Sequence, residues 1–208
     1  MFALASRRRP GITLEQVLDR ATRVSNDVAA RRERWNVETP WSALTRLIYD
    51  FFGMEFAEPM AELEMVFWKA SATTRPMPGA RAALADLHRS GLAVAVVSNS
   101  LFGHDVIRYE LGKHGLAEYL AFVMVSAEYA VRKPNVLLFD TAAARLGVEP
   151  ADIWFVGDRL DTDMAGARAA GMTAVQFRPP PGEQANGVDL TVTSWLELVE
   201  RVQDARHA

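Results

Sequence analysis

The sequence contains no cysteine, which excludes a disulfide framework, a thiolate zinc site and a cysteine nucleophile. It also has no apolar run close to the ~20 residues that a membrane span requires. Its net charge of -3 provides no basic surface for nucleic acid or for an anionic membrane. These absences favour a cytoplasmic protein that has neither nucleic acid nor membrane as a partner.

The first third of the chain shows helical patterns only. Thr13-Leu14-Glu15-Gln16 has the form of a capping box, and Pro40 and Pro59 suit the first turns of two further helices. We therefore predict a helical domain over residues 12–75, followed by a proline-containing linker. This region contains three tryptophans, which we expect to form its small core; alternatively, some of them line a substrate pocket that faces the second domain. They are Trp35, Trp41 and Trp68.

From residue 76 to residue 208, strand and helix patterns alternate, which predicts an α/β domain with a doubly wound parallel sheet. The unbroken apolar run at 92–97 predicts a strand that is buried on both faces. Further strands are expected at 121–125, 153–156, 173–177 and 189–192. The expected helices cover 80–90, 103–114, 135–146, 163–170 and 195–205.

Two polar segments of the α/β region suit phosphate binding. Ser98-Asn99-Ser100 follows the strand at 92–97, and a hydroxyl with backbone N–H groups at such a turn can cradle phosphate. Lys133 precedes Pro134 at the start of a predicted helix, so its ammonium can point at the sheet edge. Each signal has an ordinary alternative, because Ser-Asn is common in turns and a single lysine is usually solvated.

A third polar segment suits a metal ion. Gly157-Asp158 ends the predicted strand at 153–156, and Asp163 opens the next helix. Carboxylates at the carboxyl edge of a parallel sheet lie where α/β proteins bind ligands, and their hard oxygens suit Mg²⁺. Asp163 has an alternative role as a helix cap, because a carboxylate is favourable at a helix N-terminus.

Taken together, these segments resemble the motifs of the haloacid dehalogenase-like (HAD) superfamily. Val96-Val97-Ser98-Asn99 is similar to its second motif and Lys133-Pro134 to its third. Gly157-Asp158 with Asp163, followed by Gly166-Ala167 and Ala170-Gly171-Met172, is similar to its fourth. The close resemblance covers residues 78–178, and the helical region before it is similar to the cap that follows the family's first motif.

The resemblance implies a hydrolase of small phosphorylated metabolites that works through an aspartyl phosphate and Mg²⁺. It implies Ser98, Asn99 and Lys133 as catalytic residues: the Ser98 hydroxyl and nearby N–H groups would hold the phosphoryl oxygens, and Lys133 would offset the charge of nucleophile and phosphate. It implies Asp158 as a magnesium ligand, and Asp163 as a residue that orders the metal shell or the lysine. The helical cap would then close over the site and select the leaving group.

The family's first motif, Asp-x-Asp at the end of the first strand, has no counterpart here, because the first aspartate is Asp19 inside a predicted helix. One explanation is that the first strand is absent from this chain. The other is that residues 2–6 form it, with Ala3 and Ala5 in place of the aspartates. We favour the first, which leaves the neighbours of that strand apart or forces them to pair directly.

Either explanation removes the nucleophile, so we expect these 208 residues to have little phosphatase activity by themselves. Two other functions remain open at this point. One is a non-catalytic module that binds a phosphorylated metabolite without turnover. The other is haloacid dehalogenase chemistry, in which an aspartate attacks carbon and no metal is needed.

Overall fold

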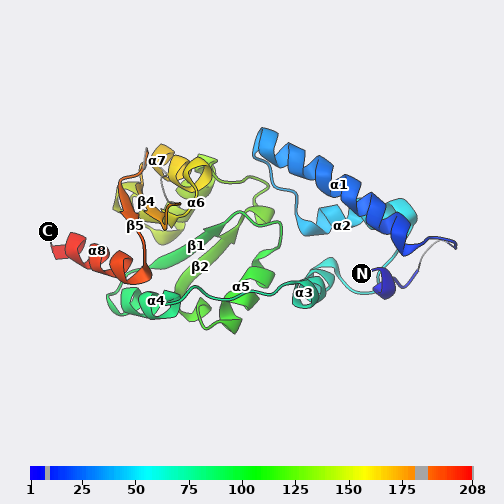
Figure 1. Ribbon diagram of the computed structural model, residues 1–208, viewed down its shortest axis with the longest axis horizontal. Helices are drawn as coiled ribbons and strands as arrows, with labels where there is room; N and C mark the ends of the chain where they lie inside the picture. The colour runs from blue at the N-terminus through cyan, green and yellow to red at the C-terminus, as the bar shows by residue number, and fades with distance from the viewer. Residues whose placement is uncertain (8–9, 181–186, 208) are drawn as a thin grey trace.

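The computed structural model describes residues 1–7, 10–180 and 187–207 of the chain. The molecule is elongated and has two parts (Figure 1). Helices α1 to α3 form one end, which we call the helical part, and the strands with α4 to α8 form the other, which we call the α/β part. The N-terminus lies at the helical end and the C-terminus at the opposite end.

The helical part contains α1 (Leu14–Trp35), α2 (Trp41–Tyr49) and α3 (Met60–Ser71). The predicted capping box is confirmed: the Thr13 side chain accepts from the backbone N–H of Gln16, and the Gln16 side chain accepts from the N–H of Thr13. Pro40 and Pro59 are the N-caps of α2 and α3, one residue before the predicted first turns. Short 3₁₀ turns cover Phe2–Leu4 and Asp50–Phe52.

The α/β part follows the predicted alternation of helices and strands. Its strands are β1 (Val94–Ser98), β2 (Leu120–Val125), β3 (Trp154–Gly157), β4 (Thr173–Phe177) and β5 (Leu190–Val192). Its helices are α4 (Ala80–Arg89), α5 (His104–Lys113), α6 (Val136–Leu146), α7 (Ala165–Ala169) and α8 (Trp195–His207). Each predicted strand and helix of this part is present, with ends within a few residues of the prediction.

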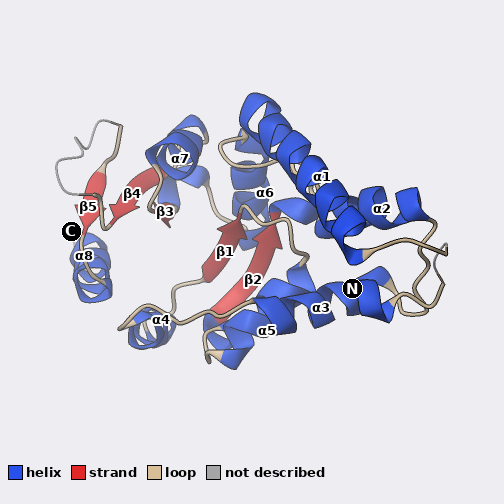
Figure 2. Ribbon diagram, turned by 45° about the vertical axis from the view of Figure 1, so that its right-hand side comes forward, coloured by secondary structure: helices blue, strands red, loops and turns tan. Residues whose placement is uncertain are grey.

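All strand pairs are parallel, but the strands of the described chain form two separate sheets. One sheet has the order β1-β2 and the other the order β3-β4-β5 (Figure 2). The α/β fold class is thus confirmed, whereas the single continuous sheet is not seen. The sequence analysis left two arrangements open for the strands beside an absent first strand: separation or direct pairing. Direct pairing is not seen, because β1 and β3 belong to different sheets.

One hydrophobic cluster joins the two sheets. Its buried members come from β2, α6, α7 and β4, and half-buried residues of β1 and β3 pack against it. In α6, Phe139 is fully buried and lies against Phe155 of β3, with ring centroids 4.7 Å apart. A β-carbon at Gly166 of α7 would collide with the Phe139 ring. Gly166 was predicted to let its helix pack closely on the sheet. In the structure it instead lets α7 pack closely on α6.

Two expectations from the sequence are wrong. Residues 2–6 do not form a core strand, because Phe2–Leu4 is a 3₁₀ turn and the N–H of Ser6 donates to the carbonyl of Glu55 in the helical part. The strand at the 92–97 run is not buried on both faces, because every residue of β1 is only half-buried. Among the described strands β1 pairs only with β2, so its other edge is not covered by a strand.

The tryptophans of the helical part also differ from the expected shared core. Trp41 is buried, whereas Trp35 is 56% exposed at the end of α1. Trp68 is half-buried, and its indole N–H donates to Glu110 of α5 over 2.8 Å. Among the described helices, none combines the length and the apolarity that crossing a bilayer requires.

Candidate functional site

Lys133 joins the carboxyl ends of the two sheets. Its Nζ donates to the carbonyl of Val97 in β1 over 2.8 Å and lies 2.7 Å from Oδ1 of Asp163, which follows β3. The side chain is 11% exposed and its ammonium also lies over the ring of Phe155, 5.4 Å from the centroid. An ammonium has three N–H donors, and the described residues account for two of them. The third donor has no hydrogen-bond acceptor among the described residues.

Asn99 holds the backbone of Lys133 in place. Its Oδ1 accepts from the N–H of Lys133 over 2.8 Å, and its Nδ2 donates to the carbonyl of the same residue over 3.1 Å. This pair of bonds fixes the loop after β2 to the end of β1. The structure thus shows Asn99 orienting Lys133, and the phosphate contact suggested by the sequence pattern stays a prediction.

Asp163 lies in a single π-helical turn, Leu160–Met164, rather than at an ordinary helix N-cap. Its Oδ2 accepts from the backbone N–H groups of Asp158 and Arg159, each over 3.2 Å. The residue is 4% exposed, and a β-carbon at Gly157 would lie 2.5 Å from the Asp163 side chain. Glycine at 157 is therefore required for the carboxylate to lie against the end of β3.

Asp158 and Ser98 complete the predicted set. Asp158 is exposed at the same rim, and its carboxylate has no hydrogen bond or ion pair to the described part of the chain. Ser98 is the half-buried last residue of β1. The end of β1, the Lys133 loop and the end of β3 thus lie together, as predicted, at one rim of the α/β part, which we call the carboxyl rim.

A second buried carboxylate lies beside this rim, and the sequence pattern did not reveal it. The side chain of Glu38 is fully buried between Arg32 of α1 and Arg132, the residue before Lys133. Its Oε2 also accepts from the Ser126 hydroxyl over 2.6 Å. Ser126 in turn accepts from the N–H of Ser100 over 2.9 Å. The available signal, one glutamate between two helical segments, was too weak to identify it.

Backbone pairing strengthens this junction between the two parts. The N–H of Glu38 donates to the carbonyl of Ala130, and the N–H of Arg132 donates to the carbonyl of Asn36. The N–H of Trp41 donates to Leu101 in the loop after β1. The Lys133 loop is therefore bonded to the segment that connects α1 with α2, and the loop after β1 is bonded to the first residue of α2.

Aromatic rings cover the space between the helical part and the loop after β1. Phe102 stacks on Phe67 with centroids 6.2 Å apart and meets Trp68 edge-on at 4.8 Å. Trp41 lies 5.4 Å from Phe67. Trp68 thus contacts the loop after β1 through Phe102, and Trp41 contacts the same loop through its backbone N–H.

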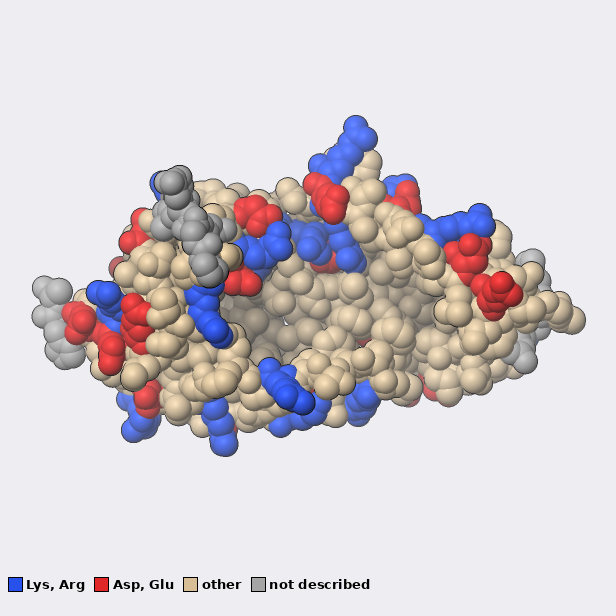
Figure 3. Space-filling model, viewed as in Figure 1, with Lys and Arg blue, Asp and Glu red and all other residues tan. Residues whose placement is uncertain are grey.

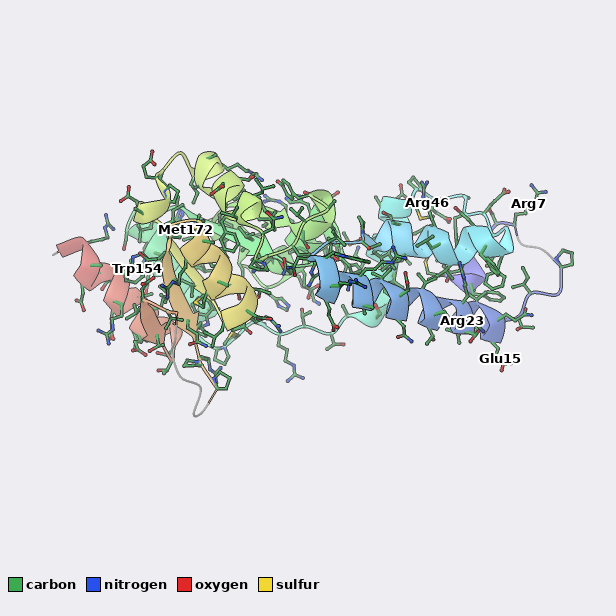
Figure 4. The ribbon with its side chains drawn as sticks, turned by 90° about the horizontal axis from the view of Figure 1, so that it is seen from above. Arg7, Glu15, Arg23, Arg46, Trp154 and Met172 are labelled. Atoms are coloured by element: carbon green, nitrogen blue, oxygen red, sulfur yellow. The ribbon has the colours of Figure 1, made fainter. Side chains whose placement is uncertain are left out.

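The surface is hollowed on the face seen in Figure 1, near β1, and Lys and Arg side chains gather around the hollow (Figure 3). Two open, shallow pockets lie elsewhere. One of about 270 Å³ is in the helical part and includes Asp19 and Arg23, and one of about 310 Å³ lies at the amino ends of β1 and β2. Arg7, Arg23 and Arg46 sit at the far end from Trp154 and Met172 (Figure 4).

The sequence model of the haloacid dehalogenase-like hydrolase family matches residues 5–171 of the chain. The phosphoserine phosphatase of Thermus thermophilus is 36% identical over 118 residues, which are 57% of this chain and 47% of that protein. The glyceraldehyde 3-phosphate phosphatase of Methanopyrus kandleri is 38% identical over 108 residues, 51% of this chain and 45% of that protein. The chain thus spans about half the length of these curated relatives.

The crystal structure of a HAD phosphatase from Thermococcus onnurineus shares the fold, with a TM-score of 0.64 and 24% identity. The superposition covers 90% of this chain and 86% of that one. The family match includes the helical part as well as β1, the Lys133 loop and the Asp158–Asp163 segment. The motifs, the fold and the match over most of the sequence agree, and the chain belongs to the haloacid dehalogenase-like hydrolase family.

Proposed function

We propose that the carboxyl rim binds the phosphate group of a small phosphorylated metabolite, and that the chain is of the phosphate-monoester hydrolase type. The observation that carries this proposal is Lys133. Its ammonium is held by Val97 and Asp163 and retains one N–H donor at the rim that also bears Ser98. A fixed cation beside a hydroxyl is the arrangement that holds phosphoryl oxygens.

The names of the relatives support the same proposal. The two curated proteins described above are phosphatases of phosphoserine and of glyceraldehyde 3-phosphate. Both named substrates are small phosphate monoesters. We therefore take a small phosphate monoester, rather than a phosphoprotein or a nucleic acid, as the ligand class of this chain.

Magnesium fits the rim only in part. Asp158 offers an exposed carboxylate, whereas Asp163 is occupied by Lys133 and two backbone N–H groups. No group of three acidic or histidine side chains in the described residues could form a complete metal site. Mg²⁺ is commonly held by one or two carboxylates together with phosphate oxygens and water. We propose that Asp158 holds it in this way, where it would neutralise phosphate charge.

The rim's own residues support binding more strongly than turnover. Asp158 and Asp163 are its carboxylates, and the sequence has no Asp-x-Asp pair before residue 19 to supply a nucleophile. This absence favours the second candidate function, phosphate binding without hydrolysis, for residues 1–208 as they stand. We further propose that the helical part acts as a cap, and that Phe67, Trp68 and Phe102 select the rest of the ligand.

Titration calorimetry with inorganic phosphate, with and without Mg²⁺, tests the proposal. We expect binding that falls at least tenfold in Lys133→Met and in Ser98→Ala. Lys69→Met is the matched control, because Lys69 is an exposed lysine in α3. Ser98→Ala removes one hydroxyl from a half-buried position, so it tests the site even if Lys133→Met fails to fold. Absence of phosphate binding by the unaltered chain would contradict the proposal.

An assay with p-nitrophenyl phosphate and Mg²⁺ separates binding from hydrolysis. We expect little turnover, because no nucleophilic aspartate pair is present. Turnover within about tenfold of ordinary family members corresponds to roughly 1.4 kcal/mol of barrier. If such activity were found and were lost in Asp158→Asn, hydrolysis by this chain would be established and the binding-only candidate rejected.

A further inference from the structure

The aromatic rings between the two parts lie at one end of the loop whose other end bears Ser98. We call these rings the aromatic cluster; its members are Trp41, Phe67, Trp68 and Phe102. Phe102 follows Ser98 by four residues, and four residues of extended chain reach at most about 14 Å. A small molecule whose phosphate lies at Ser98 therefore has the aromatic cluster within that distance.

Phe67 is the most accessible ring of the aromatic cluster. Trp41 is buried and Trp68 and Phe102 are half-buried, whereas Phe67 is 36% exposed. Phe102 stacks on the Phe67 ring with the two planes 20° apart, and Trp41 contacts it at a tilt of 37°. Because two neighbouring rings fix its position, the exposed part of Phe67 is a preformed surface for another ring.

The aromatic cluster offers few hydrogen-bonding groups. Its side chains carry two polar atoms, the indole nitrogens of Trp41 and Trp68, and the N–H of Trp68 already donates to Glu110 over 2.8 Å. Sugar hydroxyls placed against these rings would lose water partners without gaining new ones, which costs free energy. A flat aromatic group has little to lose in this way and gains stacking area. The aromatic cluster therefore favours a ring over a polyol.

Carboxylates at the same end of the loop disfavour a second anionic group on the ligand. Glu64 of α3 accepts from the backbone N–H of Gly103 over 3.0 Å. Burial raises the pKa of Glu64 and the negative charges of Asp105 and Glu128 raise it further, against the hydrogen bond from Gly103. In the described chain, none of these three carboxylates pairs with a lysine or an arginine. A ligand carboxylate would meet uncompensated negative charge here.

We propose that the ligand is a nucleoside monophosphate whose base stacks on Phe67. Among phosphate monoesters, this class combines one phosphate with a flat and uncharged heteroaromatic ring. The ammonium of Lys133 then meets the phosphate at the carboxyl rim, and the rings of the helical part meet the base. The inference rests on the proposed function, because it takes the phosphate to lie at that rim.

Titration calorimetry with four ligands tests the inference on the unaltered chain. Uridine 5′-monophosphate has both ring and phosphate, ribose 5-phosphate lacks the ring, uridine lacks the phosphate, and 3-phosphoglycerate carries a carboxylate in place of the ring. We expect uridine 5′-monophosphate to bind at least tenfold more tightly than ribose 5-phosphate, which is about 1.4 kcal/mol, because stacking adds to the phosphate contact. Of the three esters, 3-phosphoglycerate should bind most weakly.

Phe67→Leu removes the stacking surface and keeps an apolar side chain. We expect the tenfold preference for uridine 5′-monophosphate over ribose 5-phosphate to fall below about twofold in this variant. Phe51→Leu is the matched control and should keep the preference, because Phe51 is 58% exposed in the pocket that contains Asp19 and Arg23. In proton NMR spectra, the uracil ring protons should move upfield on binding to the unaltered chain, and less in Phe67→Leu.

Three results would overturn the inference. The first is equal affinity of the unaltered chain for uridine 5′-monophosphate and ribose 5-phosphate. The second is tighter binding of 3-phosphoglycerate than of uridine 5′-monophosphate. The third is a preference for uridine 5′-monophosphate that persists in Phe67→Leu. The first two need no variant, so they decide the matter even if Phe67→Leu fails to fold.

Uridine alone separates this inference from the proposed function. If neither inorganic phosphate nor ribose 5-phosphate binds, but uridine binds the unaltered chain and not Phe67→Leu, the phosphate site is rejected and the ring site stands. If both phosphates bind and the ring adds nothing, the ring site alone is rejected. Absence of binding by all four ligands and by inorganic phosphate rejects both proposals.

Discussion

Arg132 and Lys133 are neighbours in one loop, yet they bind two different buried carboxylates. Arg132 pairs with Glu38, together with Arg32 and the Ser126 hydroxyl. Lys133 pairs with Asp163, whose other oxygen is occupied by backbone N–H groups. The first pair joins the helical part to the α/β part, and the second joins β1 to the end of β3.

The two ion clusters differ in whether the cation is also proposed to bind a ligand. Glu38 is fully enclosed by two guanidinium groups and a hydroxyl, so its site is complete and structural. Lys133 keeps one N–H donor beyond its contacts with Val97 and Asp163 at the carboxyl rim. One loop thus couples a closed ion cluster to an open one, and the position of the helical part bears directly on the residue proposed to bind phosphate.

The largest expected effect comes from opening the closed cluster. Glu38→Gln leaves two arginines without a carboxylate in a buried site, so the free energy of unfolding should fall by about 3 to 5 kcal/mol. Urea denaturation measures it. Glu33→Gln, an exposed glutamate in α1, is the control and should change stability by less than about 0.5 kcal/mol. Equal effects of the two variants would show that the Glu38 cluster contributes nothing particular.

Gly157→Ala disturbs the open cluster without changing a charge. The new methyl group would lie 2.5 Å from the Asp163 side chain and displace it from Lys133. We expect a loss of about 1 to 3 kcal/mol from overpacking. Gly112→Ala in α5 is the matched control. Nothing lies within 4 Å of its β-carbon, and alanine there should stabilise by up to about 1 kcal/mol. Stabilisation by both variants would contradict the packing described for Asp163.

Glu110 of α5 gives a third carboxylate for comparison, with the smallest expected effect. Burial raises its pKa, but hydrogen bonds from Thr74, Trp68 and Lys113 outweigh burial and lower the pKa from 4.5 to about 2. The stabilisation is therefore complete above pH 4.5 and is lost as the pH falls towards 2.

Comparing the unaltered chain with Glu110→Gln between pH 7 and pH 2 tests this dependence. At pH 7 we expect the variant to lose about 1 kcal/mol, because an amide keeps part of the hydrogen bonding. The difference should shrink as the pH falls below 4.5. A difference that is constant with pH would show that the carboxylate charge is not what Thr74 and Trp68 stabilise.

The elements of the α/β part could be predicted from the sequence because each has a strong local signal. The apolar run before Ser98, and Pro134 at the start of a predicted helix, act within a few residues of themselves. Lys133 and Asp163 could be placed at one rim because parallel strands end on the same side of a sheet. The resemblance to a known family added the expectation that these motifs act together at one site.

The interactions that escaped prediction are long-range. Glu38 meets Arg132 across 94 positions of sequence, and no local pattern distinguishes it from a surface glutamate. The half-burial of β1 is set by what packs against its edges and faces, which the strand's own apolar residues cannot reveal. The two bonds from Asn99 to the backbone of Lys133 also escaped prediction, because a side chain's partner at a turn is decided by the loop that packs against it.

The contact between Phe139 and Gly166 has a consequence for sequence variation. Any side chain at position 166 would enter the space of the Phe139 ring, so the two positions cannot vary independently. In a library randomised at both sites, larger residues at 166 should survive only in combination with smaller ones at 139. The allowed residue pairs would show how far apart α6 and α7 can lie. Because α6 packs against strands of both sheets, they would also show how far apart the two sheets can lie.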